Sequence, residues 1–517
     1  MNYLALLVFL YATLSNTVIA QPKYDHTWIL NGIDYAGTVL EDDMVLKFLE
    51  NNEIVFQNSI GIGNNWYPTV LNNPQDGNLA AFTDGCEMRD DNAEVLPDGQ
   101  ILVPENDYYE FTCVTNSIGY IKRETFFLPN PASEDSYYYI YPIKNNTFHV
   151  SGLAYTEVTL NMGQPTIGEK LEVVFEYDGV DMLVEFLFEQ LAATRHANGR
   201  DWWILYPYGI EHKYEVFLLS PEGLNHSHTI SFLSPNSFAY YYTDYEFSPL
   251  GDYFICSGGD MLQVYAFDRC DGQLTELERF NSHPQVTATG VGTLGYSPDG
   301  EKFFIASIDT IYQYRFDTST TIEDTRAFVG AYDGMTPSGS AATRFGQMAL
   351  TPDGRLFISG NTNIPYLHSI DNPNGIGTEA NLVQRAIELP YPTDVHLPNF
   401  PNQKLLSLDG SPCDTLGIDN IYYDEVTDTE YVRPTDLAGL EIYPNPTPNV
   451  VQVHLPDLTQ RASLEVLDLT GRILDIVPAD GQPTVQLDLS DYPAGMYLIQ
   501  YRTAFGALTH RERVVRQ

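Results

Sequence analysis

The sequence predicts an all-β protein, in which a β-propeller of about seven blades is followed by a small immunoglobulin-like β-sandwich. Two observations lead to this fold class. Short alternating strands separated by turn residues occupy most of the 517 residues, with almost no helical periodicity. A turn of the Ser-Pro-Asp-Gly type also recurs at intervals of about 50 residues, the length of one four-stranded blade. A pair of β-sandwiches is the alternative fold for the body.

The repeated turn has a clear physical basis. Three copies occupy Ser248–Asp252, Ser297–Gly300 and Thr351–Gly354, and an apolar strand follows each copy. Proline fixes φ at the first corner, aspartate bonds nearby backbone amides, and glycine accepts the positive φ before the next strand. Two repeats continue into a strand that ends in aromatic-x-Phe-Asp, at Tyr265–Asp268 and Tyr314–Asp317. The body has room for about eight such units, and seven units with long loops fit equally well.

The chain divides into four regions. We expect a signal peptide at 1–20, a propeller-like body at 21–432, a linker at 433–439 and a compact strand-rich module at 440–517. The signal peptide has a short apolar core and a small residue, Ala20, before Gln21, which places the cleavage between these two residues. Its first residues contain neither Lys nor Arg, a departure from the usual pattern. No later stretch approaches about 18 uninterrupted apolar residues, so the mature chain is expected to have no transmembrane segment.

The chain is strongly acidic, with a formal net charge of −43 and a pI near 4.3. Such a field repels polyanions, which argues against nucleic acid as a partner. Calcium binding, salt tolerance and solubility outside the cell all explain the acidity, and solubility is the simplest explanation. Calcium is conceivable at Asp90-Asp91-Asn92, but the spacing matches no EF-hand and a solvated acidic turn explains these residues as well. No other cofactor is expected.

Five cysteines follow the signal peptide, and an oxidising compartment favours pairing of some of them. The odd number leaves at least one unpaired. Cys256 and Cys270 flank a predicted hairpin, and Cys86 and Cys113 lie on either side of a turn region, so these are the candidate pairs. Cys413 is the fifth. None of them belongs to a Cys-x-x-Cys motif, which argues against a redox or zinc site.

The C-terminal module contains several motifs in a fixed order. Tyr-Pro-Asn-Pro opens it, Gly-Arg lies in the middle, Tyr-Pro-Ala-Gly-Met-Tyr comes near the end, and a basic tail closes it. The residues concerned are Tyr443, Pro444, Asn445, Pro446, Gly471, Arg472, Tyr492, Pro493, Ala494, Gly495, Tyr497 and the tail 511–516. Through these motifs the module closely resembles the type A sorting domain of the bacterial type IX secretion system. In a generic sandwich the same prolines and glycine would only shape turns.

This resemblance implies a destination. Proteins with such a domain pass through the periplasm and leave a Bacteroidota-type cell through the type IX secretion machinery, and the domain is often removed on the way. The protein is therefore expected outside the cell or on its outer surface. Less sharply, Gly77–Cys86, Arg195–Trp203 and Leu367–Asn374 resemble secreted propeller-like proteins that carry the same domain. That group is functionally uncharacterised and implies no catalytic residues.

The body offers one candidate ligand surface. It consists of His196, Arg200, Asp201, Trp202 and Trp203, which combine a polar cluster with an aromatic platform suited to a sugar ring. The structural alternative is a tight Asn-Gly hairpin whose charged residues pin neighbouring strands while one tryptophan packs between blades, and the strong turn signal favours this alternative.

Tyrosine is also abundant, with 36 copies and runs at 137–141 and 240–242. Alternate residues of a strand face opposite sides, so part of each run must be core, while an exposed remainder could stack on carbohydrate. Strand propensity alone explains most of these residues.

No catalytic or cofactor-binding residues can be assigned from motifs. The sequence contains neither Gly-x-Ser-x-Gly nor His-Glu-x-x-His, and its carboxylates are too numerous for any pair to be informative. We therefore expect a non-enzymatic propeller that binds polysaccharide, glycoprotein or another surface protein. The alternative is an extracellular polymer-degrading hydrolase or lyase, which would need His, Arg, Tyr and acidic residues converging at the central channel. A structural role in adhesion or gliding is the third hypothesis.

The sorting assignment predicts the fate of a truncated chain. Deletion of 440–517 removes the expected export signal, so the body should accumulate in the periplasm. Fractionation and immunoblotting of cells and medium measure this distribution. Undiminished secretion of the truncated protein would show that the C-terminal module is not required for export.

Overall fold

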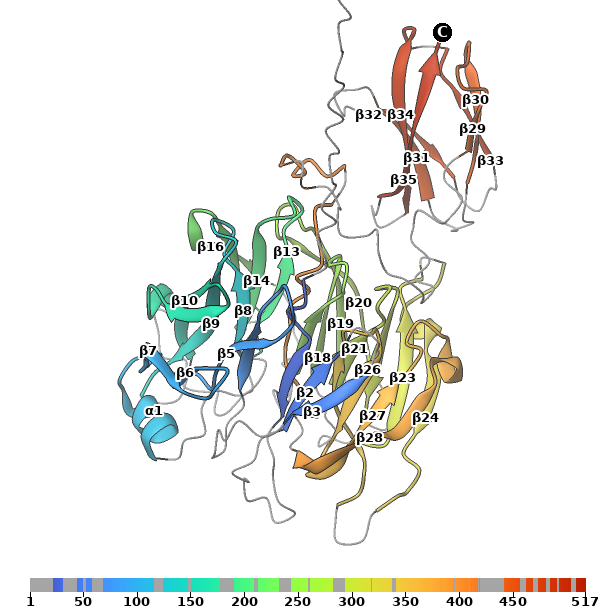
Figure 1. Ribbon diagram of the computed structural model, residues 1–517. Helices are drawn as coiled ribbons and strands as arrows, with labels where there is room; N and C mark the ends of the chain where they lie inside the picture. Colours follow the sequence, from blue (N-terminus) through green and yellow to red (C-terminus); the bar gives the residue numbers. More distant parts are fainter. Residues whose placement is uncertain are drawn as a thin grey trace, which may run out of the picture.

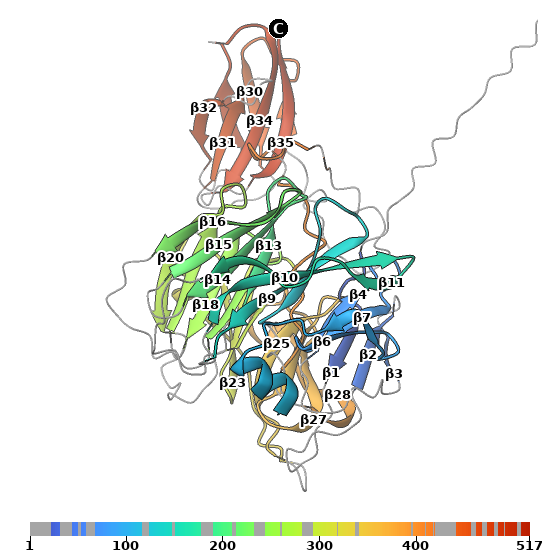
Figure 2. The same cartoon turned by 90° about the vertical axis from the view of Figure 1, so that its left-hand side faces the viewer.

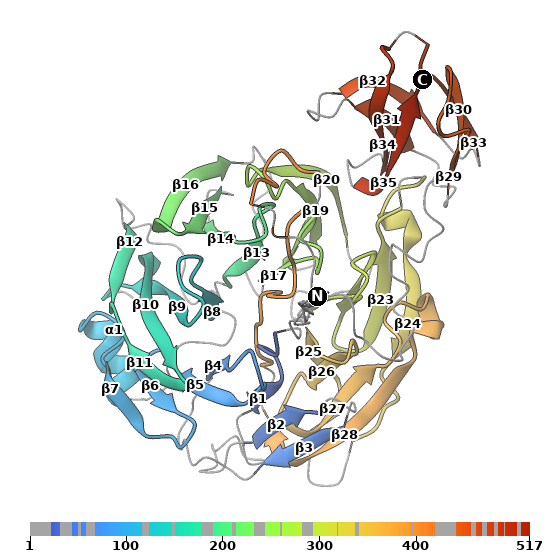
Figure 3. The same ribbon diagram turned by 45° about the horizontal axis from the view of Figure 1, so that its top comes forward.

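The structure is a computed structural model, and it describes most of the chain. The described residues are 22–30, 44–49, 53–57, 68–115, 124–146, 150–176, 190–208, 213–231, 243–258, 261–281, 293–317, 319–336, 341–393, 396–408, 410–416, 418, 441–455, 462–467, 473–479, 484–490, 492–503 and 508–517. Within them, seven antiparallel sheets form a ring, and two further sheets form the C-terminal module (Figures 1 and 3).

The first three sheets of the ring differ in size. The first contains β1 (Thr27–Leu30), β2 (Met44–Phe48) and β3 (Ile54–Gln57). The second contains β4 (Thr69–Asn72), β5 (Leu79–Thr83), β6 (Glu87–Asp90) and β7 (Val95–Gln100). The third contains β8 (Phe126–Pro129), β9 (Ser136–Lys144), β10 (Val150–Asn161), β11 (Gln164–Ile167) and β12 (Glu172–Glu176). Strand β10 pairs with both β11 and β12, and the β10–β11 hairpin extends over the second sheet, where the Lys170 ammonium donates to two of its carbonyls (Figure 2).

The remaining four sheets of the ring each contain four sequential strands. The fourth contains β13 (Ala192–Arg195), β14 (Trp202–Tyr208), β15 (Lys213–Ser220) and β16 (Gly223–Ser231). The fifth contains β17 (Thr243–Phe247), β18 (Tyr253–Gly258), β19 (Met261–Phe267) and β20 (Leu274–Asn281). The sixth contains β21 (Thr293–Tyr296), β22 (Lys302–Ala306), β23 (Thr310–Arg315) and β24 (Ala327–Ala331), and the seventh contains β25 (Phe345–Leu350), β26 (Leu356–Gly360), β27 (Ile364–Ile370) and β28 (Leu382–Thr393).

Among the described residues, helical structure is confined to short segments. They are α1 (Asp107–Tyr109), the π-helical turn η1 (Glu110–Thr115), and the 3₁₀ turns η2 (Glu323–Thr325) and η3 (Gly377–Ala380). In Figure 3, β4, β13 and β17 lie toward the middle of the ring and β7, β16 and β20 lie at its rim. This radial arrangement of seven antiparallel sheets in the described part of the chain is a seven-bladed propeller, as the sequence predicts, and the alternative of paired sandwiches is wrong for the body.

The predicted Ser-Pro-Asp-Gly turns connect the first and second strands of the fifth, sixth and seventh sheets. Their glycines Gly251, Gly300 and Gly354 have φ values of +72°, +72° and +82°, which confirms the left-handed position. The hydroxyl that opens each turn also bonds to the turn's own aspartate, as Ser248 does with Asp252 at 2.6 Å. The turn is therefore specified locally.

Middle strands of the ring are buried on both faces because each sheet lies between two others. Tyr139 and Tyr141 of β9 pack toward the second sheet, while Tyr138 and Ile140 pack toward the fourth. The 137–141 run therefore leaves no exposed rings to stack on carbohydrate, and that part of the expectation is wrong. The 240–242 run lies outside the described residues.

Two disulfides are present among the described residues. The bond between Cys86 and Cys113 confirms one expected pair. The other expected pair is wrong, because Cys270 bonds to Cys413, 143 residues away, and Cys256 stays free and buried in β18. Burial raises the pKa of the Cys256 thiol to about 12.

The C-terminal module is a sandwich of two antiparallel sheets. One contains β29 (Glu441–Tyr443), β30 (Val450–His454) and β33 (Thr484–Asp488), and the other contains β31 (Ala462–Leu467), β32 (Ile473–Pro478), β34 (Gly495–Thr503) and β35 (Leu508–Arg516). Aliphatic residues of both sheets, such as Val453, Val466 and Leu487, form one core. The small immunoglobulin-like sandwich is thus confirmed.

One carboxyl inside the ring has unusual surroundings. Asp84, directly after β5, is 2% exposed, and its Oδ1 accepts from the backbone amides of Cys86 at 2.8 Å and Glu87 at 3.0 Å. Its Oδ2 has no hydrogen-bond partner among the described residues. Burial raises the pKa of Asp84 to about 7 although the two amides oppose this shift.

This raised pKa predicts a pH-dependent loss of stability. An unfolded aspartate titrates near pH 4, so the stabilising contribution of the protonated Asp84 is complete below that pH and is lost as the pH rises through about 7. Asp84→Asn keeps the accepting oxygen but carries no charge. We expect the variant and the wild type to be equally stable near pH 4, and the variant to be more stable by up to about 4 kcal/mol at pH 8.

Urea unfolding followed by tryptophan fluorescence, at several pH values, measures this difference. Asp90→Asn is a matched control, since Asp90 also accepts two backbone amides but is partly exposed. Parallel pH profiles for the wild type and Asp84→Asn would contradict the prediction.

Candidate functional site

The predicted ligand surface comprises the turn between β13 and β14 and the first two residues of β14. This turn takes the place in the fourth sheet that the Ser-Pro-Asp-Gly turns take in later sheets. The side-chain amide of Asn198 donates to the Asp201 carboxylate at 2.7 Å, and Gly199 has a φ of +77°. The Asn-Gly turn expected from the sequence is therefore present.

Both tryptophans that follow this turn are buried, so they cannot serve as a platform for a sugar ring. Trp202 packs with Phe126 of the third sheet, and Trp203 packs with Phe247 of the fifth. The Trp203 indole also donates to the Arg269 carbonyl at 2.8 Å. The aromatic part of the predicted surface is thus corrected: the rings fill the spaces between neighbouring blades.

The polar members of the predicted surface mostly contact one another. The Arg200 guanidinium donates to the buried Asp201 carboxylate at 2.7 and 3.2 Å. The His196 ring lies against Trp203, and its Nδ1 accepts from the backbone amide of Asn198 at 3.0 Å. Burial lowers the pKa of His196. Only His196 and Arg200 of the five keep part of their surface exposed. These contacts favour the structural interpretation of the turn.

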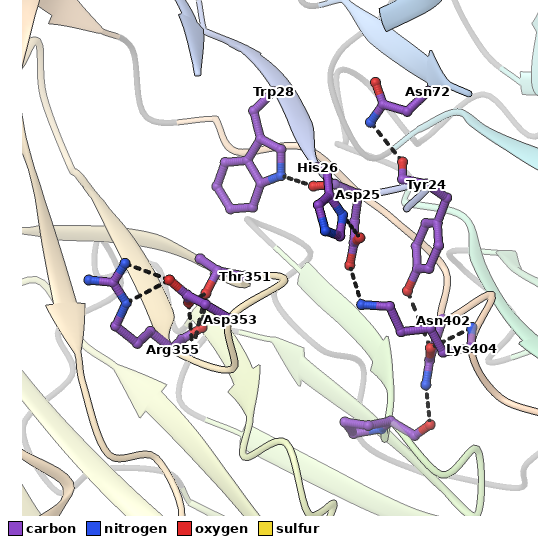
Figure 4. Close-up of polar contacts among 11 residues, drawn as sticks. Tyr24, Asp25, His26, Trp28, Asn72, Thr351, Asp353, Arg355, Asn402 and Lys404 are labelled. Atoms are coloured by element: carbon purple, nitrogen blue, oxygen red, sulfur yellow. Dashed lines mark hydrogen bonds and ion pairs between the residues drawn. The ribbon is translucent and has the colours of Figure 1, made fainter. Parts of the chain in front are cut away.

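A second polar group gathers near the middle of the ring, where the two ends of the body meet. We name it the closure cluster: Tyr24, Asp25, His26, Asn402 and Lys404 (Figure 4). Asp25 Oδ1 lies 3.0 Å from His26 Nδ1, and Asp25 Oδ2 lies 3.3 Å from the Lys404 ammonium. The Tyr24 hydroxyl donates to Asn402 at 3.2 Å.

The electrostatics of the closure cluster follow from burial and pairing. Burial acts to raise the pKa of Asp25, but the Lys404 ammonium and the His26 ring outweigh it and lower this pKa. Burial raises the pKa of Tyr24 well above its ordinary value, with Asp25 adding to the effect. Asp25 is thus an ionised carboxylate held between two cationic or hydrogen-bonding partners.

The His26 side chain of the closure cluster is partly exposed and has a ring nitrogen available for proton transfer. His26 keeps 16% of its side chain exposed, and its Nε2 makes no hydrogen bond with the described residues. An imidazole oriented through Nδ1 by a carboxylate can accept or donate a proton at Nε2. Sequence reasoning missed this cluster because 379 residues separate Asp25 from Lys404.

The acidic turn considered for calcium can be compared with the rest of the described chain. No group of three or more His, Cys, Asp or Glu side chains that could hold an ion occurs among the described residues. At the turn considered for calcium, the Asp90 carboxylate accepts the amides of Asn92 and Glu94, each at 2.9 Å. Asp90 therefore shapes the turn between β6 and β7.

The Tyr-Pro-Asn-Pro motif ties the start of the C-terminal module to its last strand. The Asn445 amide donates to the Arg513 carbonyl at 2.7 Å and accepts from the Val515 amide at 2.9 Å. The peptide bonds before Pro444 and Pro446 are cis. Tyr443 stacks on His454 and remains exposed. The motif therefore fixes one edge of the sandwich.

The Tyr-Pro-Ala-Gly-Met-Tyr motif forms the turn before β34 and the first residues of that strand. The buried Tyr497 hydroxyl donates to the Pro493 carbonyl at 2.6 Å, and the rings of Tyr492 and Tyr497 lie 5.6 Å apart. Ala494 is exposed and Gly495 begins the strand. Four predicted site residues, Ala20, Gln21, Gly471 and Arg472, lie outside the described residues.

Comparison with known solved structures finds matches of low sequence identity and low TM-score. A putative 6-phosphogluconolactonase from Bacteroides fragilis is 12% identical with a TM-score of 0.43, covering 73% of this chain and 98% of that chain. Its counterpart from Bacteroides uniformis has the same identity and TM-score, covering 72% and 99%. The propeller domain of Cps50 (Swd1) from Myceliophteria thermophila is 10% identical with a TM-score of 0.31, covering 65% and 93%. None of these similarities bears on activity, and no curated protein matches the chain.

The comparison with protein families concerns the C-terminal module. Residues 441–515 match the model of the secretion system C-terminal sorting domain. The match covers the sandwich from β29 to β35. Among the described residues, no helix has the length and apolar character needed to cross a bilayer. The chain is therefore a β-propeller protein with a sorting domain of the type IX secretion system, which directs it to the cell surface or the extracellular space.

Proposed function

We propose that the propeller is a non-catalytic module that binds polysaccharide or protein ligands outside the cell or on its surface. The supporting observation is that the charged groups near the middle of the ring bond to other parts of the protein. Asp25 is paired with Lys404 and His26, and the buried Arg195 and Arg269 guanidinium groups donate to backbone carbonyls. These groups hold the ring together, which favours a rigid scaffold whose loops vary for recognition.

The distribution of charge narrows the class of ligand. Of the 69 acidic and 26 basic residues, 9 and 6 lie in 440–517, which leaves 60 acidic and 20 basic residues in 1–439. The negative field therefore belongs almost entirely to the propeller. Such a field disfavours acidic polysaccharides and nucleic acid. Neutral polysaccharides and neutral or basic proteins are the proposed ligands.

The limits of the mature protein are part of the same proposal. We assign 1–20 to a signal peptide cleaved between Ala20 and Gln21, 21–432 to the propeller, 433–439 to a linker and 440–517 to the sorting domain. Tyr24, which contacts Asn402, follows the proposed cleavage site and therefore stays in the mature chain.

A second candidate function rests on His26. Its ring is oriented by Asp25 and keeps Nε2 available, which is the arrangement of a general acid or base. An extracellular hydrolase or lyase acting on polymers could use this group. The two functions differ in whether a bound polymer is shortened.

Incubation of the full-length protein with immobilised polysaccharides and glycoproteins tests the binding function. We expect retention on neutral polymers or on proteins, with the chain length of the polymer unchanged and little effect of calcium. Because the propeller is acidic, retention on polyanions such as alginate should be absent at low salt. Retention on polyanions alone, or on no member of the panel, would contradict the proposal.

Substitution of His26 separates binding from catalysis. His26→Asn can still donate to Asp25 but lacks Nε2, so a binding module should retain its polymer within about two-fold of wild type. His228→Asn, in β16 of the fourth sheet, is the matched control. Polymer shortening by the wild type that is lost in His26→Asn and kept in His228→Asn would establish the enzyme instead. Chain length is measured by size-exclusion chromatography.

A further inference from the structure

The first sheet of the ring has three strands among the described residues, one fewer than each of the last four sheets. The chain segment that follows the last sheet lies beside it. We call residues 397–408 the strap. In Figure 3 this segment, coloured orange, crosses the middle of the ring from β1 toward β13 and β19. Leu397 and Phe400 of the strap pack against Trp28 of β1, so the strap covers part of the first sheet.

Lys404 of the strap makes an ion pair of a kind that lies within a single turn in two other blades. In the seventh blade, Asp353 accepts from Arg355 at 3.0 and 2.6 Å within one turn. In the sixth blade, Lys302 donates to Asp299 at 2.9 Å. In the first blade the acid, Asp25, and the base, Lys404, come from opposite ends of the body. Figure 4 shows this split ion pair together with the continuous one.

Two buried guanidinium groups fix the strap to the fourth and fifth blades. Arg195 Nε donates to the Leu405 carbonyl at 3.1 Å, and its Nη2 donates to the Gln403 carbonyl at 3.1 Å. Arg269 donates to the Leu406 carbonyl and, at 2.8 Å, to the carbonyl of Arg195 itself. The hydrogen bonds from the strap's carbonyls therefore offset part of the desolvation free energy of these buried cations.

The disulfide makes the same attachment covalent. Cys270 lies in the turn between β19 and β20, and Cys413 follows the strap. The strap contacts bring Cys413 to this turn, since the Leu408 amide donates to the Ala197 carbonyl at 2.9 Å and the Ala197 amide donates to the Arg269 carbonyl at 2.8 Å. Noncovalent docking and covalent bonding thus act on one segment.

We infer that the strap and the Cys270–Cys413 pair form a redox-controlled latch that closes the propeller. With both thiols reduced, the strap is held by its noncovalent contacts alone and can open, which exposes β1. Oxidation locks the closed ring. Each thiol loses a proton and an electron, an Sγ–Sγ bond forms, and the disulfide of an oxidant of the thiol–disulfide class is reduced to two thiols. The latch is independent of what the propeller binds.

Hydrogen–deuterium exchange of the full-length protein, before and after dithiothreitol, tests the latch. The Cys86→Ser/Cys113→Ser variant serves as background, because there the latch is the remaining described disulfide. On reduction we expect the amide exchange rate to rise at least about ten-fold both in the strap and in Tyr24–Leu30. Both segments should exchange faster because they separate when the strap opens. The same increase should be present without dithiothreitol in a Cys413→Ser variant.

Three results would overturn the inference. Unchanged exchange in the strap on reduction would show that the disulfide controls nothing. Faster exchange in the strap without a change in Tyr24–Leu30 would show that the strap does not close the ring. A response to dithiothreitol that persists in Cys413→Ser would assign it to another group. If the background variant does not fold, the wild type gives the same answer, because peptides from the strap and from 79–115 report on the two disulfides separately.

Discussion

A ring of sheets holds together only if its first and last members are joined, because each sheet packs against its two neighbours alone. In this protein the seam lies between the first and seventh sheets. Trp28 and Phe48 of the first sheet contact Phe357 of the seventh, with ring centroids 5.9 and 5.8 Å apart. Hydrophobic contact supplies most of the energy there, and the pairing of Asp25 with Lys404 sets the position of the chain ends. The radial order of every other sheet depends on this seam.

The parts of the fold that were predictable from sequence are those specified by neighbouring residues. The turns at Gly251, Gly300 and Gly354 were predictable because proline, aspartate and glycine act within a few residues of one another. The sorting domain was predictable because its motifs lie within about 80 residues and in order. The strap has no such local pattern. Several of its contacts join positions far apart in the sequence, such as Arg195 and Leu405, which are 210 residues apart. The partner of Cys270 likewise could not be deduced from spacing.

The candidate site illustrates a limit of aromatic patterns in ring-shaped proteins. Trp202 and Trp203 are adjacent, so their rings point to opposite faces of β14, and in a half-exposed sheet one of them would meet solvent. Here the fourth sheet has a neighbour on each side, and both rings enter a core. The same geometry buries Tyr138 and Tyr139. The chemistry that remains available lies instead at His26, whose neighbours Asp25 and Lys404 come from the two ends of the body.

The disulfide also determines how the protein responds to mechanical force. A surface protein held through its C-terminal module and pulled by a ligand carries tension along the segment that joins the two parts. That tension reaches Cys413 before it reaches the strap or β28. The covalent bond passes it to the turn between β19 and β20, within the fifth sheet, so the force acts across several paired strands at once. Peeling the seventh sheet away strand by strand, which is the easiest way to open a ring from its end, is thereby avoided.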